Sequence, residues 1–170
     1  MITGKLYFFT ASILNWISVL DDDERKRIII DSFDFLGKNK LARTSAFVIM
    51  PNHIHIIWQP LDDMLQLKFM KFTAQQIKFH LEKNNPAMLA SLHVCKRDRK
   101  FQIWQRDPLA IELYSREVTE QKLDYIHNNP CQGKWLLCSN PEEYEFSSIR
   151  FYEKEEKNLS FLTHYMDILG

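Results

Sequence analysis

The sequence predicts a layered α/β protein of the α+β type, in which an antiparallel sheet carries helices packed on one face. Segments rich in aromatic and β-branched residues alternate with segments whose apolar residues recur every three or four positions. Their order along the chain is strand, helix, strand, strand, helix, strand, helix, which is typical of this fold class. The chain has 170 residues, of which 45% are hydrophobic, so we expect a domain with a sizeable core.

The first half of the chain is predicted to form three strands and two helices. Acidic residues at positions 21–24 mark the start of the first helix, and Gly37 ends it. The second helix covers residues 64–84, because its core residues recur at spacings of three and four. The strands are expected at residues 5–14, 42–50 and 53–59.

The second half is predicted to hold one long helix between two short strands. The helix covers residues 116–129, and its N-terminal cap is Ser115. One strand is expected at residues 101–104, on the edge of the sheet, and the other at residues 134–138. Both strand segments are short and apolar.

The composition indicates a cytoplasmic protein with no membrane contact. Basic and acidic residues number 22 each, so the net charge is zero and a nucleic-acid partner would need local basic patches. The three cysteines lack metal-type spacing, which indicates reduced thiols. No apolar run approaches the ~20 residues of a membrane span, and no secretion signal is recognised. We expect a main domain over residues 1–152 and a charged link with a short amphipathic tail over residues 153–170.

Two histidines lie in the apolar strand predicted at residues 53–59. Side chains two apart on a strand point to the same face, so His53 and His55 would offer two imidazoles side by side. Such a pair suits a divalent metal. A solvated sheet face explains an isolated His-X-His equally well, so the pair needs a partner elsewhere in the chain.

The helix at residues 116–129 carries the side chains that would complete such a site. Tyr125 and Asn129 are four residues apart, so they share one face of the helix. The amide oxygen of Asn129 would join His53 and His55 as a third ligand to Mg or Mn, with positions left open for a phosphate oxygen. A tyrosine hydroxyl is a poor nucleophile at neutral pH, but a metal that polarises a phosphate makes attack easier.

These motifs resemble those of the single-tyrosine HUH endonucleases, in which U is a hydrophobic residue. Residues 50–55 read Met-Pro-Asn-His-Ile-His, and residues 125–130 read Tyr-Ile-His-Asn-Asn-Pro. More narrowly, the sequence is similar to the small insertion-sequence transposases and their REP-associated tyrosine transposase relatives. Residues 101–107 and 144–150 are also similar to segments of the REP-associated group.

The resemblance implies a ferredoxin-like or RRM-like fold with the catalytic helix in the C-terminal half. It implies that Tyr125 attacks a phosphate of single-stranded DNA and forms a 5'-phosphotyrosine link, which a 3'-hydroxyl of another strand then resolves. His53, His55 and Asn129 would bind the metal. The implied function is DNA transposition, a form of DNA recombination, on DNA with hairpin or palindromic ends.

Basic residues form two groups that would contact DNA. The helix at residues 64–84 presents one group on one side, although a solvated helix face is the ordinary explanation: Lys68, Lys71 and Lys78. The second group lies in and near a basic loop, which would also serve as a merely solvated loop: Lys96, Arg97, Arg99, Lys100 and Arg106. A protein with these features is expected at the nucleoid when bound to DNA, and a homodimer could form through the apolar tail.

Two other functions stay open at this point. One is a non-catalytic RNA or DNA binding module on an RRM-like sheet, for which the histidines would not matter. The other is a metal-dependent phosphodiesterase that uses water in place of tyrosine. Trp58 and Trp104 are expected in the core rather than in base stacking, and Tyr114 is expected to pack rather than to act as a second nucleophile.

Overall fold

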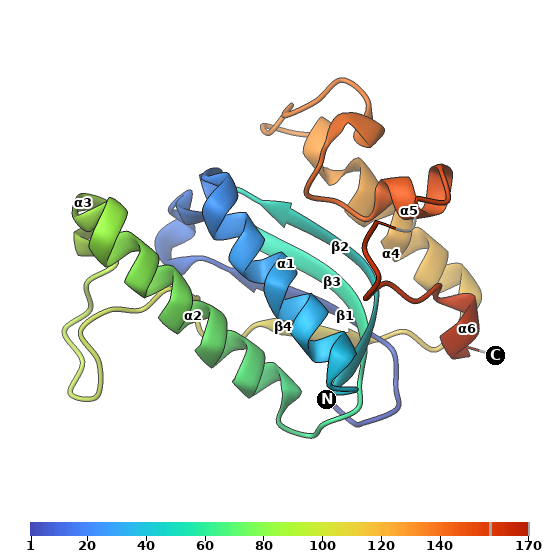
Figure 1. The fold of residues 1–170 in the computed structure, drawn as a ribbon, viewed down its shortest axis with the longest axis horizontal. Coiled ribbons are helices and arrows are strands. Elements are labelled where there is room, and N and C mark those ends of the chain that lie inside the picture. The colour runs from blue at the N-terminus through green and yellow to red at the C-terminus, as the bar shows by residue number, and fades with distance from the viewer. Residues whose placement is uncertain (157, 170) are drawn as a thin grey trace.

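The computed structural model describes residues 1–156 and 158–169, which fold around a four-stranded antiparallel sheet (Figure 1). The strands are β1 (Tyr7–Ser12), β2 (Ala42–Met50), β3 (His53–Pro60) and β4 (Leu109–Glu112). The helices are α1 (Asp23–Lys38), α2 (Leu65–Asn84), α3 (Pro86–Ser91), α4 (Arg116–Asn128), α5 (Ile149–Glu153) and α6 (Met166–Leu169). The strand order β2-β3-β1-β4, with α1 after β1 and α2 after β3, is the ferredoxin-like arrangement.

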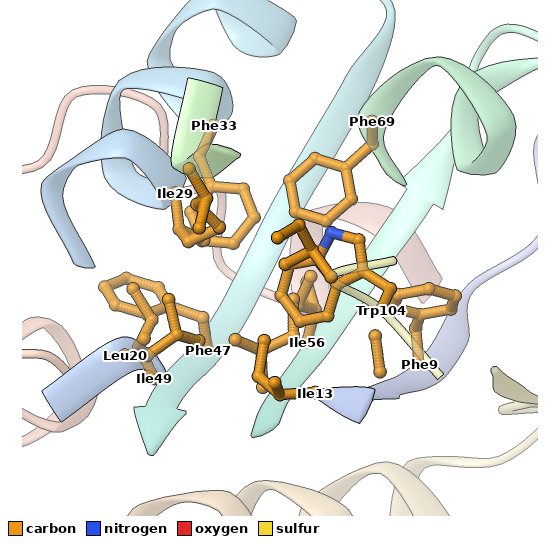
Figure 2. Close-up of a cluster of buried hydrophobic side chains, with 14 of the residues drawn as sticks. Phe9, Ile13, Leu20, Ile29, Phe33, Phe47, Ile49, Ile56, Phe69 and Trp104 are labelled. Atoms are coloured by element: carbon orange, nitrogen blue, oxygen red, sulfur yellow. The ribbon is translucent and has the colours of Figure 1, made fainter. Parts of the chain in front are cut away.

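One face of the sheet is covered by α1 and α2, as predicted. One buried cluster on this face holds Phe9 of β1 and Ile56 of β3 together with Ile29 and Phe33 of α1 and Phe69 of α2 (Figure 2). The Phe33 and Phe69 rings stack with their centroids 5.7 Å apart. These contacts join the two helices to each other and to the sheet, and they form the larger of two apolar cores.

The opposite face of the sheet is covered by α4. Phe8, Val48 and Ile57 project from the strands on this side and pack against Leu123 and Ile126 of the helix. The central strand β3 is therefore buried on both faces, including its polar residues His53, His55 and Gln59. The sequence predicted helices on one face, and the structure adds α4 on the other.

The edge of the sheet at β2 is closed by residues from the last third of the chain. Ile49 donates from its backbone amide to the carbonyl of Phe146, and Ser148 donates in the same way to Phe47. Further along, the amide of Thr163 donates to the carbonyl of Thr44. The backbone groups of β2 that face away from the sheet are thus partly satisfied by the chain itself.

Two of the predicted strands are wrong. The fourth strand is β4, whereas residues 101–104 form only isolated bridges, at Phe101 and Trp104. The Trp104 side chain turns into the core and donates from Nε1 to the hydroxyl of Thr73 on α2, so this segment packs rather than extends the sheet. Residues 134 and 135 belong to a turn, and residues 136–138 have no regular structure, with a φ of 43° at Leu136.

The predicted tail contains two side chains that pack against the domain. Phe161 belongs to the core beneath α1 and α2, and Tyr165 belongs to the core beneath α4. The Tyr165 hydroxyl donates to Glu120 of α4. Met166, by contrast, is exposed. None of the described helices has both the length and the apolar character that a membrane crossing requires.

Candidate active site

His53 and His55 lie side by side on the central strand, beneath α4. Their ring centroids are 4.8 Å apart, and both side chains are buried. Ile54 points to the opposite face, into the core beneath α1 and α2. The period of two along β3 therefore places both imidazoles in one pocket, as the sequence pattern predicted.

The ring of His53 is oriented by its neighbour Asn52. His53 Nδ1 lies 2.8 Å from Asn52 Oδ1, and Asn52 Nδ2 donates to the carbonyl of Trp16 at 2.9 Å. Because the amide nitrogen is occupied by the carbonyl, the amide oxygen faces the imidazole and accepts its Nδ1 proton. This tautomer leaves the lone pair of His53 on Nε2, where a metal would bind.

The ring of His55 is held by Thr10, its cross-strand partner on β1. Thr10 Oγ1 lies 2.7 Å from His55 Nδ1. The other ring nitrogen, Nε2, is buried and has no hydrogen-bond partner among the described residues. A buried polar atom without a partner costs free energy, which a ligand bound at Nε2 would recover.

Both histidines are neutral at physiological pH. Burial lowers the pKa of His53 to about 4; the nearby Asn129 side chain acts in the opposite direction, and the charge of Lys134 adds to the lowering. Burial also lowers the pKa of His55 to about 3, with smaller contributions from His53 and Lys122. Neutral imidazole is the form that donates a lone pair to a metal.

Helix α4 brings Tyr125 and Asn129 to the same pocket. Ser115 caps the helix by accepting from the amide of Val118. The Tyr125 ring meets that of His55 edge to face, with 5.1 Å between centroids, and the Tyr125 side chain is 46% exposed. Asn129 follows the last helical residue but keeps helical dihedral angles, so the four-residue spacing from Tyr125 still places both on one face.

The pocket has the donors that a divalent metal needs. It has a volume of about 450 Å³ and is lined by His53, His55, Tyr125 and Asn129. Asn129 Oδ1, like His55 Nε2, is buried without a hydrogen-bond partner among the described residues. Two imidazole nitrogens and one amide oxygen form a mixed set that fits a divalent ion, because a bound ion would satisfy both unpartnered atoms.

Two lysines that were not predicted add positive charge to the pocket. Lys122 Nζ lies 5.0 Å from the centre of the Phe8 ring and 5.8 Å from that of Tyr125. Lys134 lines the pocket beside Trp135. The position of Lys122, three residues before Tyr125 on a helix, was a signal available in the sequence. Lys134 lies in a turn, where no periodicity points to it.

The predicted DNA-contacting residues lie on a different part of the surface. Lys71, Lys78, Arg99 and Arg106 line an open groove between α2 and residues 98–108, and this groove shares no lining residue with the histidine pocket. Several members of the predicted set have partners: Lys68 pairs with Asp62, Lys78 with Glu82, Arg99 with Asp98, and Lys96 bonds Gln102. Arg97 and Lys100 line neither the groove nor the pocket.

A second group of possible metal donors lies away from the pocket. One ligand atom each from Asp22, Glu24 and His80 lies within 4.8 Å of the others. His80 Nε2 is 2.7 Å from Glu24 Oε2 and so links α2 to the start of α1. Asp22 already accepts from the amides of Glu24 and Arg25 as the cap of α1, so this group has a structural role.

The predictions for Trp58, Trp104 and Tyr114 have mixed outcomes. Trp58 and Trp104 are buried in the core beneath α1 and α2, as predicted. His127 is buried, and its Nε2 lies 2.9 Å from Ser148 Oγ, which is a packing role. Tyr114 does not pack as predicted, since it is 79% exposed, and it lies outside the pocket.

Fold and pocket together define the class of protein: a ferredoxin-like α+β domain in which two histidines of the central strand face a tyrosine on a later helix. A REP-associated tyrosine transposase bound to a REP hairpin has a similar structure, with a TM-score of 0.61 and 18% sequence identity over 88% of this chain and 79% of that one. This likeness confirms the fold that the sequence resemblance implied. A candidate transposase from Deinococcus radiodurans R1 matches with a TM-score of 0.44 and 14% identity over 72% of this chain and 88% of that one. No family model matches the sequence, and no curated protein matches it.

Proposed function

We propose that the protein cleaves single-stranded DNA at one phosphate and joins the cut end to another strand through Tyr125. One observation carries this proposal: the Tyr125 ring lies against His55 in a pocket that also holds two buried, unpartnered donor atoms. The activity is that of an endonuclease and strand transferase, and within a mobile element it would carry out transposition. The hairpin bound to the similar transposase supports single-stranded DNA with hairpin or palindromic ends as the substrate.

The first step exchanges one phosphate ester for another. The hydroxyl oxygen of Tyr125 forms a bond to phosphorus and loses its proton, while the bond from phosphorus to the 3'-oxygen breaks and that oxygen gains a proton. One fragment keeps a free 3'-hydroxyl, and the other is joined through its 5'-phosphate to Tyr125. In the second step a 3'-hydroxyl of another strand attacks the phosphotyrosine, which restores the tyrosine. Each step conserves the number of phosphate esters, so no ATP is consumed.

The side chains around Tyr125 have separate roles in these steps. His53, His55 and Asn129 would hold Mg or Mn, which supplies Lewis-acid polarisation of the phosphate when bound. Thr10 and Asn52 act from behind the histidines and keep their rings in place. The charge of Lys122, close to the Tyr125 ring, favours a phosphate there and stabilises the negative charge that develops during attack.

The test is the capture of the covalent intermediate. Single-stranded hairpins with randomised flanking bases carry a label at the 3' end, since that fragment would remain on the protein. With Mn present, we expect a labelled protein band on a denaturing gel that protease treatment removes. Tyr125→Phe should abolish the band, and Tyr114→Phe, a change at the exposed tyrosine outside the pocket, should retain it.

Other outcomes of the same assay would identify the alternative functions. Cut DNA without an adduct, at equal rates in wild type and Tyr125→Phe, would show a phosphodiesterase that uses water. Binding in a native gel without any cutting would show a non-catalytic nucleic-acid binding module. Either result would overturn the proposed function.

A further inference from the structure

An exposed indole stands at the mouth of the histidine pocket on a strained turn. Trp16 is 60% exposed and lines the pocket. Asn15 and Trp16 have φ angles of 54° and 57°, in the left-handed region that residues other than glycine rarely adopt. Such strain costs free energy and persists where the surroundings enforce it, most often at functional sites.

The strained turn is fixed by the same residue that orients His53. Asn52 Nδ2 donates to the carbonyl of Trp16, and the Asn52 carbonyl accepts from the amide of Ile13 just before the turn. The Trp16 side chain itself gains little burial from this conformation. Asn52 thus fixes the backbone that carries the indole and also contacts the ring of His53.

A second indole reaches the same side of the pocket from the other end of the chain. The Trp135 ring centroid lies 5.8 Å from that of His53, and the Trp16 centroid lies 6.3 Å from it. The Nζ atom of Lys134 lies 5.0 Å from the centre of the Trp135 ring. Two indoles and a cation next to the pocket match the way proteins hold single-stranded nucleic acid, by base stacking and by charge on the backbone.

The rings follow an order through the pocket. Tyr125 contacts His55, His55 contacts His53, and His53 contacts both Trp16 and Trp135. Among the described residues, no ring contact joins Tyr125 to either indole. A phosphate held at the two histidines would therefore have the nucleophile on one side and the indoles on the other.

The geometry of the reaction indicates which nucleotide would lie beside the two indoles. In phosphoryl transfer the attacking and leaving oxygens lie roughly in line on opposite sides of phosphorus. With Tyr125 on the His55 side, the leaving 3'-oxygen points toward the His53 side. We propose that Trp16 and Trp135 bind, by stacking, the unpaired base of the nucleotide on the 5' side of the cleaved phosphate. This role rests on the proposed function and defines a substrate that is single-stranded at that nucleotide.

Binding in the absence of cleavage tests the stacking role. The protein carries Tyr125→Phe, and the probes are fluorescein-labelled (dT)12 and an oligomer of the same length made only of abasic units, each with Mn present. Trp16→Ala and Trp135→Ala should each weaken (dT)12 binding by roughly 5-fold to 100-fold, the usual effect of losing one base stack. Binding of the abasic oligomer should not change, and Trp16→Phe, which keeps an aromatic ring, should stay within about threefold of wild type.

Two results would overturn the inference. One is unchanged (dT)12 binding in both alanine variants; the other is an equal loss for (dT)12 and the abasic oligomer, which would indicate a charge or folding effect.

A cleavage assay tests which nucleotide the indoles bind. Once the cleaved position is mapped, an abasic unit on its 5' side should slow cleavage by the wild-type protein but should not slow cleavage by Trp16→Ala any further. An abasic unit on the 3' side of the cleaved position should change the cleavage rate of the wild-type protein and of Trp16→Ala by the same factor. The binding assay needs no nucleophile, so it tests the stacking role separately from the proposed function. If the alanine variants lose (dT)12 binding but the wild-type protein forms no covalent adduct, the proposed strand transfer is refuted and the stacking site stands.

Discussion

The Nδ1 atom of His53 lies 2.8 Å from the amide oxygen of Asn52, its neighbour in the sequence. That contact leaves the lone pair of the buried ring on Nε2. The same amide reaches the backbone of Trp16, so one side chain sets both a metal ligand and an aromatic wall of the pocket.

Loss of the Asn52 amide should weaken metal binding without removing a ligand. We expect Asn52→Ala to lower the affinity for Mn by about 10-fold to 100-fold, the usual effect of removing a residue that orients a metal-bound histidine. Titration calorimetry on the purified protein measures this directly. Asn39→Ala, a change to an exposed amide at the end of α1, serves as the control. An unchanged Mn affinity in a folded Asn52→Ala protein would contradict the assignment.

Metal should stabilise the fold through His55. A ligand at 100 times its dissociation constant adds about 2.7 kcal/mol to the free energy of unfolding. For a chain of this size, that corresponds to a rise in the melting temperature of roughly 5 to 10 °C. His55→Ala should abolish the rise caused by Mn, whereas His93→Ala, at an exposed position, should retain it. Scanning calorimetry with Mn and with EDTA measures this difference in melting temperature. If Mn raised the melting temperature of His55→Ala as much as that of wild type, the metal would bind elsewhere.

Acid should destabilise the protein through its buried histidines. Burial lowers the pKa of His127 to about 4, while an unfolded histidine has a pKa near 6.5. Between these values the unfolded chain binds more protons, so the free energy of unfolding falls as the pH drops from 6.5 toward 4. The slope is at most ~1.4 kcal/mol per pH unit for one histidine, and His53 and His55 act in the same direction.

The contribution of His127 can be separated by substitution. Urea unfolding of His127→Gln at several pH values between 4 and 7 should give a shallower slope than wild type, because one titrating group is gone. His93→Gln, at the exposed histidine, should leave the slope unchanged. Equal slopes in all three proteins would mean that His127 does not titrate differently on folding.

Lys122 should affect the chemical step and not the metal. Lys122→Gln removes the charge beside Tyr125 but keeps a polar side chain of nearly the same reach, and we expect adduct formation to slow by about 10-fold to 1000-fold. The Mn affinity should stay close to that of wild type, since Lys122 is not a ligand. Lys5→Gln is the control, because Lys5 pairs with Glu112 outside the pocket. An unchanged rate of adduct formation would exclude this role.

The groove beside α2 should contribute affinity for DNA without contributing chemistry. Lys71 and Arg106 line it, and neither forms an ion pair with another described residue. If both contact phosphates of a bound strand, replacing both with Gln should reduce the slope of log affinity against log salt by about 1.4, or ~0.7 per contact on single strands. Fluorescence anisotropy over a range of salt concentrations measures this slope. An unchanged slope would show that Lys71 and Arg106 do not contact DNA phosphates.

Much of the pocket followed from local sequence periodicity. A period of two placed His53 and His55 on one face of β3, and a spacing of four placed Tyr125 and Asn129 on one face of α4. These relationships hold within one element, so the sequence alone suffices. Neither the metal nor the nucleophile role of these side chains follows from placement, and both remain predictions.

What the sequence did not predict depends on contacts between distant segments. Leu109–Glu112 is largely exposed and has little strand character, and only pairing with β1 makes it β4. Trp16 lies in a left-handed turn without glycine, which a hydrogen bond from Asn52 maintains and which no local pattern indicates. The sequence predicted helices on one face only, whereas α4 covers the histidine face of β3, opposite α1 and α2.

The closed edge of β2 bears on how two copies of the chain could meet. Backbone groups of Thr44, Phe47 and Ile49 already bond residues from the last third of the same chain. A second copy would reach that edge only after this segment had detached. Assembly through β2 would therefore be a reciprocal exchange of C-terminal segments between copies rather than the simple addition of one sheet to another.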